Sequence, residues 1–206
     1  MILAIDTSVG ISIALHDGTE TVSEISSSQH GLQGELTAQY LQNALEFAGC
    51  KPSDVTVVVV GVGPGPFTGL RVGIATAVTF AHALGIPVHG LCSLDAIGFT
   101  NNEECVVVTD ARRKELYWAT YVGGLRMSEP AVDTPQEILT LNPSAQFIGP
   151  AATLYPELII GQPIELQAGF LADLFTRGLG QIQPITPMYL RKPDAVPPTE
   201  RKQVLS

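Results

Sequence analysis

The 206-residue chain has little charge: 15% of its residues are Asp, Glu, Lys or Arg, whereas an average soluble domain has about 25%. Basic side chains are scarcest in residues 1–100, where Lys51 and Arg71 face eight acidic side chains. Tight nucleic-acid binding usually requires a basic patch, because affinity comes largely from neutralised phosphates. We interpret the only basic triplet, Arg112-Arg113-Lys114, as a solvated turn. The sequence therefore predicts no tight nucleic-acid binding by this chain alone.

Cysteine and long hydrophobic runs are scarce as well. The three cysteines form no CxxC pair and no zinc spacing, which is typical of buried thiols in a reducing compartment. The best apolar run, residues 55–60, is strand-sized, and the N-terminus lacks the basic region of a signal peptide. We therefore expect a cytoplasmic protein without a membrane segment.

Hydrophobic residues make up 45% of the chain, and a chain of 21.8 kDa can bury roughly 70% of its surface. In the first half, hydrophobic periodicity and turn residues predict a three-stranded antiparallel start, followed by alternating helices and strands. The expected strands are 2–6, 11–15, 21–25 and 55–60, with another beginning at 86, and the expected helices are 32–47 and 68–84.

A polar stretch at 100–104 predicts the start of a second, smaller lobe. Its expected elements are a strand at 105–109, a hairpin at 117–122, a helix at 135–141, a strand at 146–148, a helix at 169–178 and an extended proline-rich tail. The sequence therefore predicts an α/β protein with mixed sheets flanked by helices, an N-terminal lobe at 1–100 and a C-terminal lobe at 101–206.

A glycine-rich turn, Gly61–Gly69, lies between a buried strand and a helix, where phosphate-binding loops occur. No Gly-Lys-Ser/Thr follows it, and its glycine spacing does not match a dinucleotide fingerprint. Two interpretations stay open: a rigid connection in which glycines allow close packing, or direct phosphate binding.

The helix predicted at 68–84 has one charge and no polar face. A helix that is apolar all round must be covered all round. Gly69, Gly73 and Ala77 form a ridge of small residues that lets another backbone approach. The cover is either a partner or second copy of the chain, or plain burial inside one core.

Catalytic and metal-binding patterns are not visible. The four histidines make no HxxxH pair, and there is no Gly-x-Ser-x-Gly elbow. Asp6-Thr7-Ser8 either holds magnesium and nucleotide phosphate or forms an Asx turn that opens a hairpin. Asp110 is expected to cap a turn, and an ion pair between Arg112 and Glu115 would contribute little at the surface.

Several motifs, in order along most of the chain, resemble the bacterial TsaB (YeaZ) family. They are Ile2-Leu3-Ala4-Ile5-Asp6-Thr7-Ser8, His30 before a helix, the run from Gly63 to Gly73 (GPGPFTGLRVG), Ser93-Leu94, Asp110-Ala111-Arg112-Arg113, Glu115-Leu116-Tyr117-Trp118-Ala119 and Pro187-Met188-Tyr189-Leu190-Arg191.

The resemblance implies a two-lobed fold like that of the actin, hexokinase and Hsp70 group. It also implies a non-catalytic subunit that pairs with the catalytic paralogue TsaD and the ATPase TsaE. That complex transfers a threonylcarbamoyl group to the adenosine beside the anticodon of ANN-decoding tRNAs. The family's chains also self-dimerise through the two N-terminal helices. By the same resemblance, tRNA is met only through the complex. We expect no cofactor held tightly by this chain, with ATP and magnesium bound at the level of the complex.

The resemblance and the apolar helix together place a partner interface on the two N-terminal helices. Its expected residues are His30, Leu36, Tyr40, Gly69, Leu70, Arg71, Val72, Gly73, Thr76, Ala77 and Phe80. The chain departs from the family pattern at Pro66, where serine is common, at Gly31 after His30, and at Lys114 in place of glycine. The alternatives are an ATP-dependent phosphotransferase of the same fold group and a glycoprotease-like metallopeptidase, against which the missing HxxxH argues.

Overall fold

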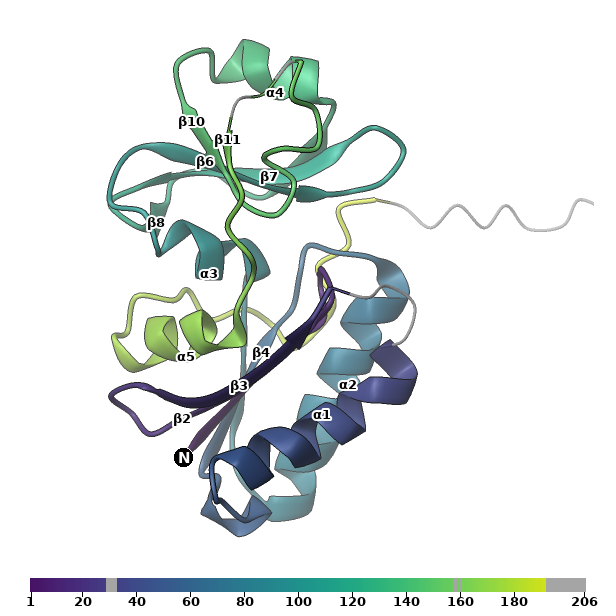
Figure 1. Ribbon diagram of the computed structural model, residues 1–206, viewed down its shortest axis with the longest axis vertical. Coiled ribbons are helices and arrows are strands. Elements are labelled where there is room, and N and C mark those ends of the chain that lie inside the picture. Colours follow the sequence, from purple (N-terminus) through teal and green to yellow (C-terminus); the bar gives the residue numbers. More distant parts are fainter. Residues whose placement is uncertain (29–32, 158, 160, 192–206) are drawn as a thin grey trace, which may run out of the picture.

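The computed structural model describes residues 1–28, 33–157, 159 and 161–191, which form two lobes, each built on one sheet (Figure 1). The first sheet has the strand order β3-β2-β1-β4-β5. Its first three strands are antiparallel, as predicted, and β1, β4 and β5 are parallel. The strands are β1 (Ile2–Asp6), β2 (Ile11–His16), β3 (Thr21–Ser27), β4 (Val57–Gly61) and β5 (Val88–Leu91).

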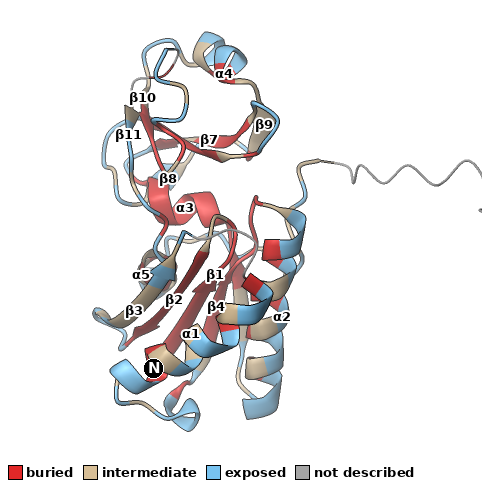
Figure 2. Ribbon diagram, turned by 45° about the vertical axis from the view of Figure 1, so that its right-hand side comes forward, coloured by how far each residue is buried: buried red, intermediate tan, exposed pale blue. Residues whose placement is uncertain are grey.

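Strand β1 lies at the centre of the first sheet, and all five of its residues are buried. Successive side chains of a strand point to opposite faces. Leu3 and Ile5 therefore pack with α1 (Gln33–Phe47) and α2 (Phe67–Leu84), whereas Ile2 and Ala4 pack on the other face with α5 (Ala168–Thr176). Figure 2 shows the buried strands between the helix layers.

The second sheet has the order β11-β10-β6-β7-β8, and β9 also pairs with β7. Val106 and Val108 pack with the helix α4 on its outer face, and Cys105 and Val107 pack with α3 on its inner face. Helix α3 thus lies between the lobes (Figure 1). The elements are α3 (Ser93–Gly98), β6 (Cys105–Asp110), β7 (Leu116–Val122), β8 (Leu125–Arg126), β9 (Ala131–Asp133), α4 (Pro135–Leu141), β10 (Gln146–Ile148) and β11 (Gly161–Gln162).

The last described part of the chain returns from the second sheet to the first. Helix α5 covers the face of the first sheet opposite α1 and α2. After α5, Gln183 pairs with Gly90, and the Met188 N–H donates to the Val62 carbonyl at 2.7 Å. Elements on both sides of residue 100 therefore build the first lobe, and the division of the chain at that residue stays a prediction.

The glycine-rich turn wraps closely around the end of β1. A Cβ atom on Gly61 would overlap the Asp6 carboxylate, and one on Gly69 would lie 2.6 Å from the Thr7 carbonyl oxygen. A Cβ on Gly65 would lie 2.7 Å from the Ser8 carbonyl oxygen. No ordinary Cβ fits at these distances, so the glycines allow close packing, as the first of the two interpretations expects.

Some boundaries differ from those predicted. The strand expected at 55–60 lies at 57–61, because Thr56 instead bonds to the Met1 carbonyl. Strands β7 and β8 form the predicted hairpin. Helix α3 and strands β9 and β11 were not predicted, since each is shorter than two turns of helix or than a period-two pattern can reveal. Residues 29–32, with His30 and Gly31, and the tail after 191 lie outside the described residues.

We expected no segment long and apolar enough to cross a membrane. Judged by length and composition alone, that expectation is wrong for one helix. Helix α2, with 18 residues and a mean hydropathy of 1.3, meets that test. Its Leu70, Ala77 and Ala81 are nevertheless buried against the first sheet. A core helix of a globular protein meets the same test, so the composition is weak evidence for a membrane span.

We predict that Gly69→Ala destabilises the fold by about 1–3 kcal/mol, because its Cβ would meet a backbone oxygen that cannot move without moving β1. Gly34→Ala is the matched control, because that helical glycine has open space around it. There we expect a gain of about 0.5–1 kcal/mol. Urea unfolding of both variants measures the two values, and equal stabilities would contradict the close packing.

Candidate functional site

The end of β1 holds a buried carboxylate, Asp6, which is 1% exposed. Its Oδ1 accepts hydrogen bonds from the Ser8 N–H at 2.7 Å and the Ser8 hydroxyl at 2.6 Å. Its Oδ2 accepts from the Ser93 hydroxyl at 2.6 Å, and the Ser93 Oγ accepts from the Gly63 N–H at 3.1 Å. Asp6 therefore joins β1 to α3 directly and to the glycine-rich turn through Ser93.

Burial raises the pKa of Asp6 above its ordinary value, and the hydrogen bonds from Ser8 and Ser93 oppose that rise. A raised folded-state pKa means that this group contributes stability below the pKa of the unfolded chain. That contribution is lost as the pH rises through the folded-state pKa. The two serines reduce the loss because they donate to the charged form.

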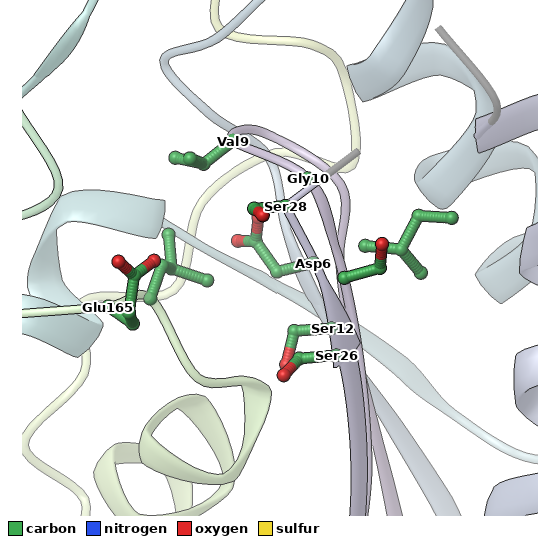
Figure 3. A pocket seen from close by; sticks show the side chains of 10 residues that line it. Asp6, Val9, Gly10, Ser12, Ser26, Ser28 and Glu165 are labelled. Carbon is green, nitrogen blue, oxygen red and sulfur yellow. The ribbon is translucent and has the colours of Figure 1, made fainter. Parts of the chain in front are cut away.

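A cavity of about 400 Å³ opens beside Asp6, between the first sheet and the segment that precedes α5 (Figure 3). Four serines contribute hydroxyl groups to its wall, with Ser12 and Ser26 on neighbouring strands. Its charged lining residues, among the described part of the chain, are the carboxylates Asp6 and Glu165. A smaller cavity of about 240 Å³ continues past Ser8 and Glu165 and is also lined by Asp110 and Arg112. A phosphate bound in the larger cavity would be repelled by these carboxylates, and no basic side chain among the described lining residues would offset that repulsion.

The structure brings two of the three candidate nucleotide-binding residues together. Ser8 bonds to Asp6, but the Thr7 hydroxyl points away and donates to the Gly69 carbonyl at 2.8 Å. The Ser8 N–H on the Asp6 carboxylate is an Asx turn, which was one of the two interpretations. Because the Asp6 carboxylate already accepts three hydrogen bonds in a buried position, this arrangement does not fit a magnesium ligand.

The turn after β6 is built around Asp110, whose Oδ1 accepts from the Arg112 N–H at 2.7 Å. This agrees with the predicted cap. Arg112 and Glu115 pair with other residues: Arg112 pairs with Asp110 at 3.1 Å, and Glu115 pairs with Arg191. The physical reason is the late segment that ends at Arg191, which reaches this turn and supplies the cation for Glu115.

A second buried polar cluster at α3 was missed by sequence reasoning. The Arg126 guanidinium lies 2.9 Å from Asp95, and the Tyr121 hydroxyl donates to the same carboxylate oxygen at 2.7 Å. Burial raises the pKa of Asp95, and the charge of Arg126 opposes the rise. The Arg126 Nη2 also donates to Gln181 at 2.9 Å. The one available signal was a lone arginine between apolar strands.

The predicted interface residues separate into two groups. Four are buried within the chain: Gly69, Leu70, Gly73 and Ala77. The ridge of small residues therefore admits the backbone of this chain's own Thr7 and not that of a partner. Arg71 is exposed, and the half-buried remainder lies on α1 and α2, namely Leu36, Tyr40, Val72, Thr76 and Phe80. His30 lies outside the described residues, and the residue-level interface stays a prediction.

An open groove of about 390 Å³ runs between the outer sides of α1 and α2. Leu41 from α1 and Ala75, Thr76, Thr79 and Phe80 from α2 line it. None of these side chains carries a charge. This outer face of the helix pair, defined by the five groove residues, is called the α1–α2 face below.

Comparison with known proteins gives concordant matches. The model of the TsaD family, tRNA N6-adenosine threonylcarbamoyltransferase, matches residues 22–163. An uncharacterised protein of Mycobacterium leprae is 42% identical over 97% of this chain and 57% of its own length. The threonylcarbamoyladenosine biosynthesis protein TsaB of Bacillus subtilis is 32% identical over 58% of this chain and 54% of its own length. The chain thus spans little more than half of these two relatives.

A solved structure, YeaZ from Pseudomonas aeruginosa, superposes with a TM-score of 0.70 at 27% identity, covering 92% of this chain and 99% of that one. The fold is therefore the two-lobed α/β architecture of that structure, with mixed sheets flanked by helices. The chain belongs to the TsaD family, and within it to the TsaB, or YeaZ, type.

We predict that Ser93→Ala destabilises the protein by about 1–3 kcal/mol, because Asp6 and the Gly63 N–H both lose a buried partner. Removing the Ser93 hydroxyl raises the pKa of Asp6 further, so the loss should be larger at pH 7 than in acid. Urea unfolding across pH measures it. Ser53→Ala, at an exposed serine, is the control, and a loss independent of pH would contradict the assignment.

Proposed function

We propose that the chain is a non-catalytic subunit of the cytoplasmic system that makes threonylcarbamoyladenosine in tRNA. In this role it pairs with a TsaD-type catalytic subunit, works with TsaE, and meets tRNA as part of their complex. The isolated chain pairs with a second copy of itself. The observation that carries the proposal is the family membership, with TsaB proteins among the relatives and YeaZ among the similar structures.

The α1–α2 face supports the pairing. Helix α2 has a mean hydropathy of 1.3, but only 33% of its residues are buried inside this chain. Val78 is 40% exposed, and Ala75 and Thr79 are exposed beside it. A large uncharged face on a globular protein marks a contact with another macromolecule, because covering it removes apolar surface from water.

The buried carboxylate of Asp6 supports a further part of the proposal, that this chain alone holds no nucleotide tightly. Its oxygens accept hydrogen bonds from Ser8 and Ser93, and Glu165 adds a second carboxylate to the cavity. Nucleotide phosphates favour cations and N–H donors over such a wall. ATP and magnesium then act at the level of the complex.

Depletion of the protein in its host tests the function. We expect threonylcarbamoyladenosine to fall in the tRNA pool, measured by nucleoside mass spectrometry, and to return when the chain is re-expressed. Persistence of the modified nucleoside after depletion would refute the proposal. Turnover of ATP by the purified chain at micromolar substrate would refute the non-catalytic assignment in favour of a phosphotransferase.

We predict that Thr79→Arg abolishes pairing of the purified chain and leaves a folded monomer, because it puts a charge on the α1–α2 face without touching the core. Thr140→Arg is the matched control, since Thr140 is exposed on α4 of the other lobe. Size-exclusion chromatography with light scattering measures the mass, and circular dichroism checks the fold. Equal masses for Thr79→Arg and the unmodified chain would contradict the location of the face.

A further inference from the structure

Basic side chains that are far apart in the sequence gather at one place between the lobes. Of the eleven Lys and Arg residues in a chain of net charge −9, five lie there: Arg71, Arg112, Arg113, Lys114 and Arg191. They come from the start of α2, the turn after β6, and the last described residues. We call this group, together with Phe67 and Tyr189, the basic–aromatic surface.

Hydrogen bonds join the three segments. The Arg71 Nε donates to the Tyr189 hydroxyl at 2.9 Å, and two residues later the Arg191 Nη1 donates to the Ala111 carbonyl at 2.9 Å. Two residues of extended chain span at most about 7 Å. Arg112 and Pro66, which precedes α2, also line one cavity. Residues 188–191 thus run past the loop that leads into α2 and reach the β6–β7 turn (Figure 1).

The aromatic part is an ordered stack. The rings of Phe67 and Tyr189 lie 4.9 Å apart at an interplanar angle of 22°, and the Arg71 guanidinium carbon lies 3.6 Å from the Phe67 ring centroid. Phe67 is 43% exposed and Tyr189 is 38% exposed. Large aromatic rings of soluble proteins are normally covered by other side chains. An exposed stack held by an arginine therefore offers its outer side to a flat ligand.

The basic part is a turn in an unusual conformation. Arg112, Arg113 and Lys114 have φ of 62°, 55° and 63°, which places three successive non-glycine residues in the left-handed region. Each such residue carries a conformational cost, and that cost is typical of functional segments. All three residues are exposed.

Carboxylates neutralise part of this charge. Asp110 pairs with Arg112, and Glu115 pairs with Arg191, while Glu165 shares a cavity with Arg112. Arg71, Arg112, Lys114 and Arg191 carry four positive charges against the two carboxylates of the ion pairs, a sum of +2, which Glu165 reduces to +1. A positive area on a strongly acidic molecule favours a polyanion over another ligand class.

We propose that the basic–aromatic surface binds a single strand of nucleic acid, with phosphates at Arg71 and the Arg112–Lys114 turn and an unpaired base stacked on Tyr189. Stacking platforms combined with basic side chains are the usual means of binding single strands. This inference rests on the proposed function in one respect, which is that the strand is RNA and not DNA. The structure confirms that the basic triplet is an exposed turn, and the proposal gives that turn a ligand.

The test is fluorescence anisotropy of the purified full chain with a fluorescein-labelled oligoadenylate RNA at low salt. We expect saturable binding that weakens as salt rises, with a log–log slope of about −0.7 for each phosphate contacted. Tyr189→Ala should weaken binding about fivefold or more, and Tyr189→Phe, which keeps the ring, should restore most of it. Arg71→Gln with Lys114→Gln should weaken binding and flatten the salt slope.

Lys51→Gln is the matched control for Lys114→Gln, because both lysines are exposed and Lys51 lies outside the basic–aromatic surface. Circular dichroism confirms that each variant is folded. Absence of binding by the unmodified chain, or equal losses with Lys51→Gln and Lys114→Gln, would overturn the inference. Binding of AMP as tight as that of the strand would also overturn it, since a free nucleotide would then be the ligand. Preferential capture of an acidic peptide such as polyglutamate would do the same.

The outcome is separable from that of the proposed function. RNA binding by the purified chain is measured without partners, and the tRNA nucleoside level is measured in cells. A fall in threonylcarbamoyladenosine on depletion with no RNA binding in vitro would overturn this inference alone. RNA binding that depends on Tyr189, with an unchanged nucleoside level, would support this inference and refute the proposed function.

Discussion

The rest of the structure depends on how the Asp6 carboxylate is held. It is buried where β1, the glycine-rich turn and α3 meet, and desolvation there would be costly without the donors on Ser8 and Ser93. Gly61 has no side chain because a Cβ would occupy the space of the carboxylate. The same network positions α3, whose Asp95 two residues later pairs with Arg126 of the second sheet. The Asp6 carboxyl group therefore links β1 to α3, the helix that lies between the lobes.

The two faces of α2 differ in composition, and each is suited to packing against a different surface. Gly69 and Gly73 are small so that the helix can lie against the residues after β1, and Ala75, Val78 and Thr79 are exposed on the other side of the helix. The scarcity of charge in the first half of the chain follows from this division. Both faces of the helix have to be covered, one by the chain's own sheet and the other by the partner that we propose.

Hydrophobic periodicity predicted most of this fold. The alternation in β2, the apolar run of β4 and the helical spacing of α1 were sufficient, because burial of local patterns decides those elements. The Asp6–Ser93 contact joins residues 87 positions apart, and no local pattern contains it. For the same reason, the sequence could not predict the contacts of Asp95 with Arg126, of Arg71 with Tyr189 or of Glu115 with Arg191.

The path of α5 has a consequence for synthesis on the ribosome. The face of the first sheet that carries Ile2 and Ala4 is covered by Leu171 and Leu174, which lie far along the chain. A chain made from its N-terminus therefore exposes this apolar face until nearly all of the described residues have left the ribosome. The first lobe is synthesised early but completes its core late. Nascent chains of intermediate length therefore expose an apolar sheet face that chaperones can recognise.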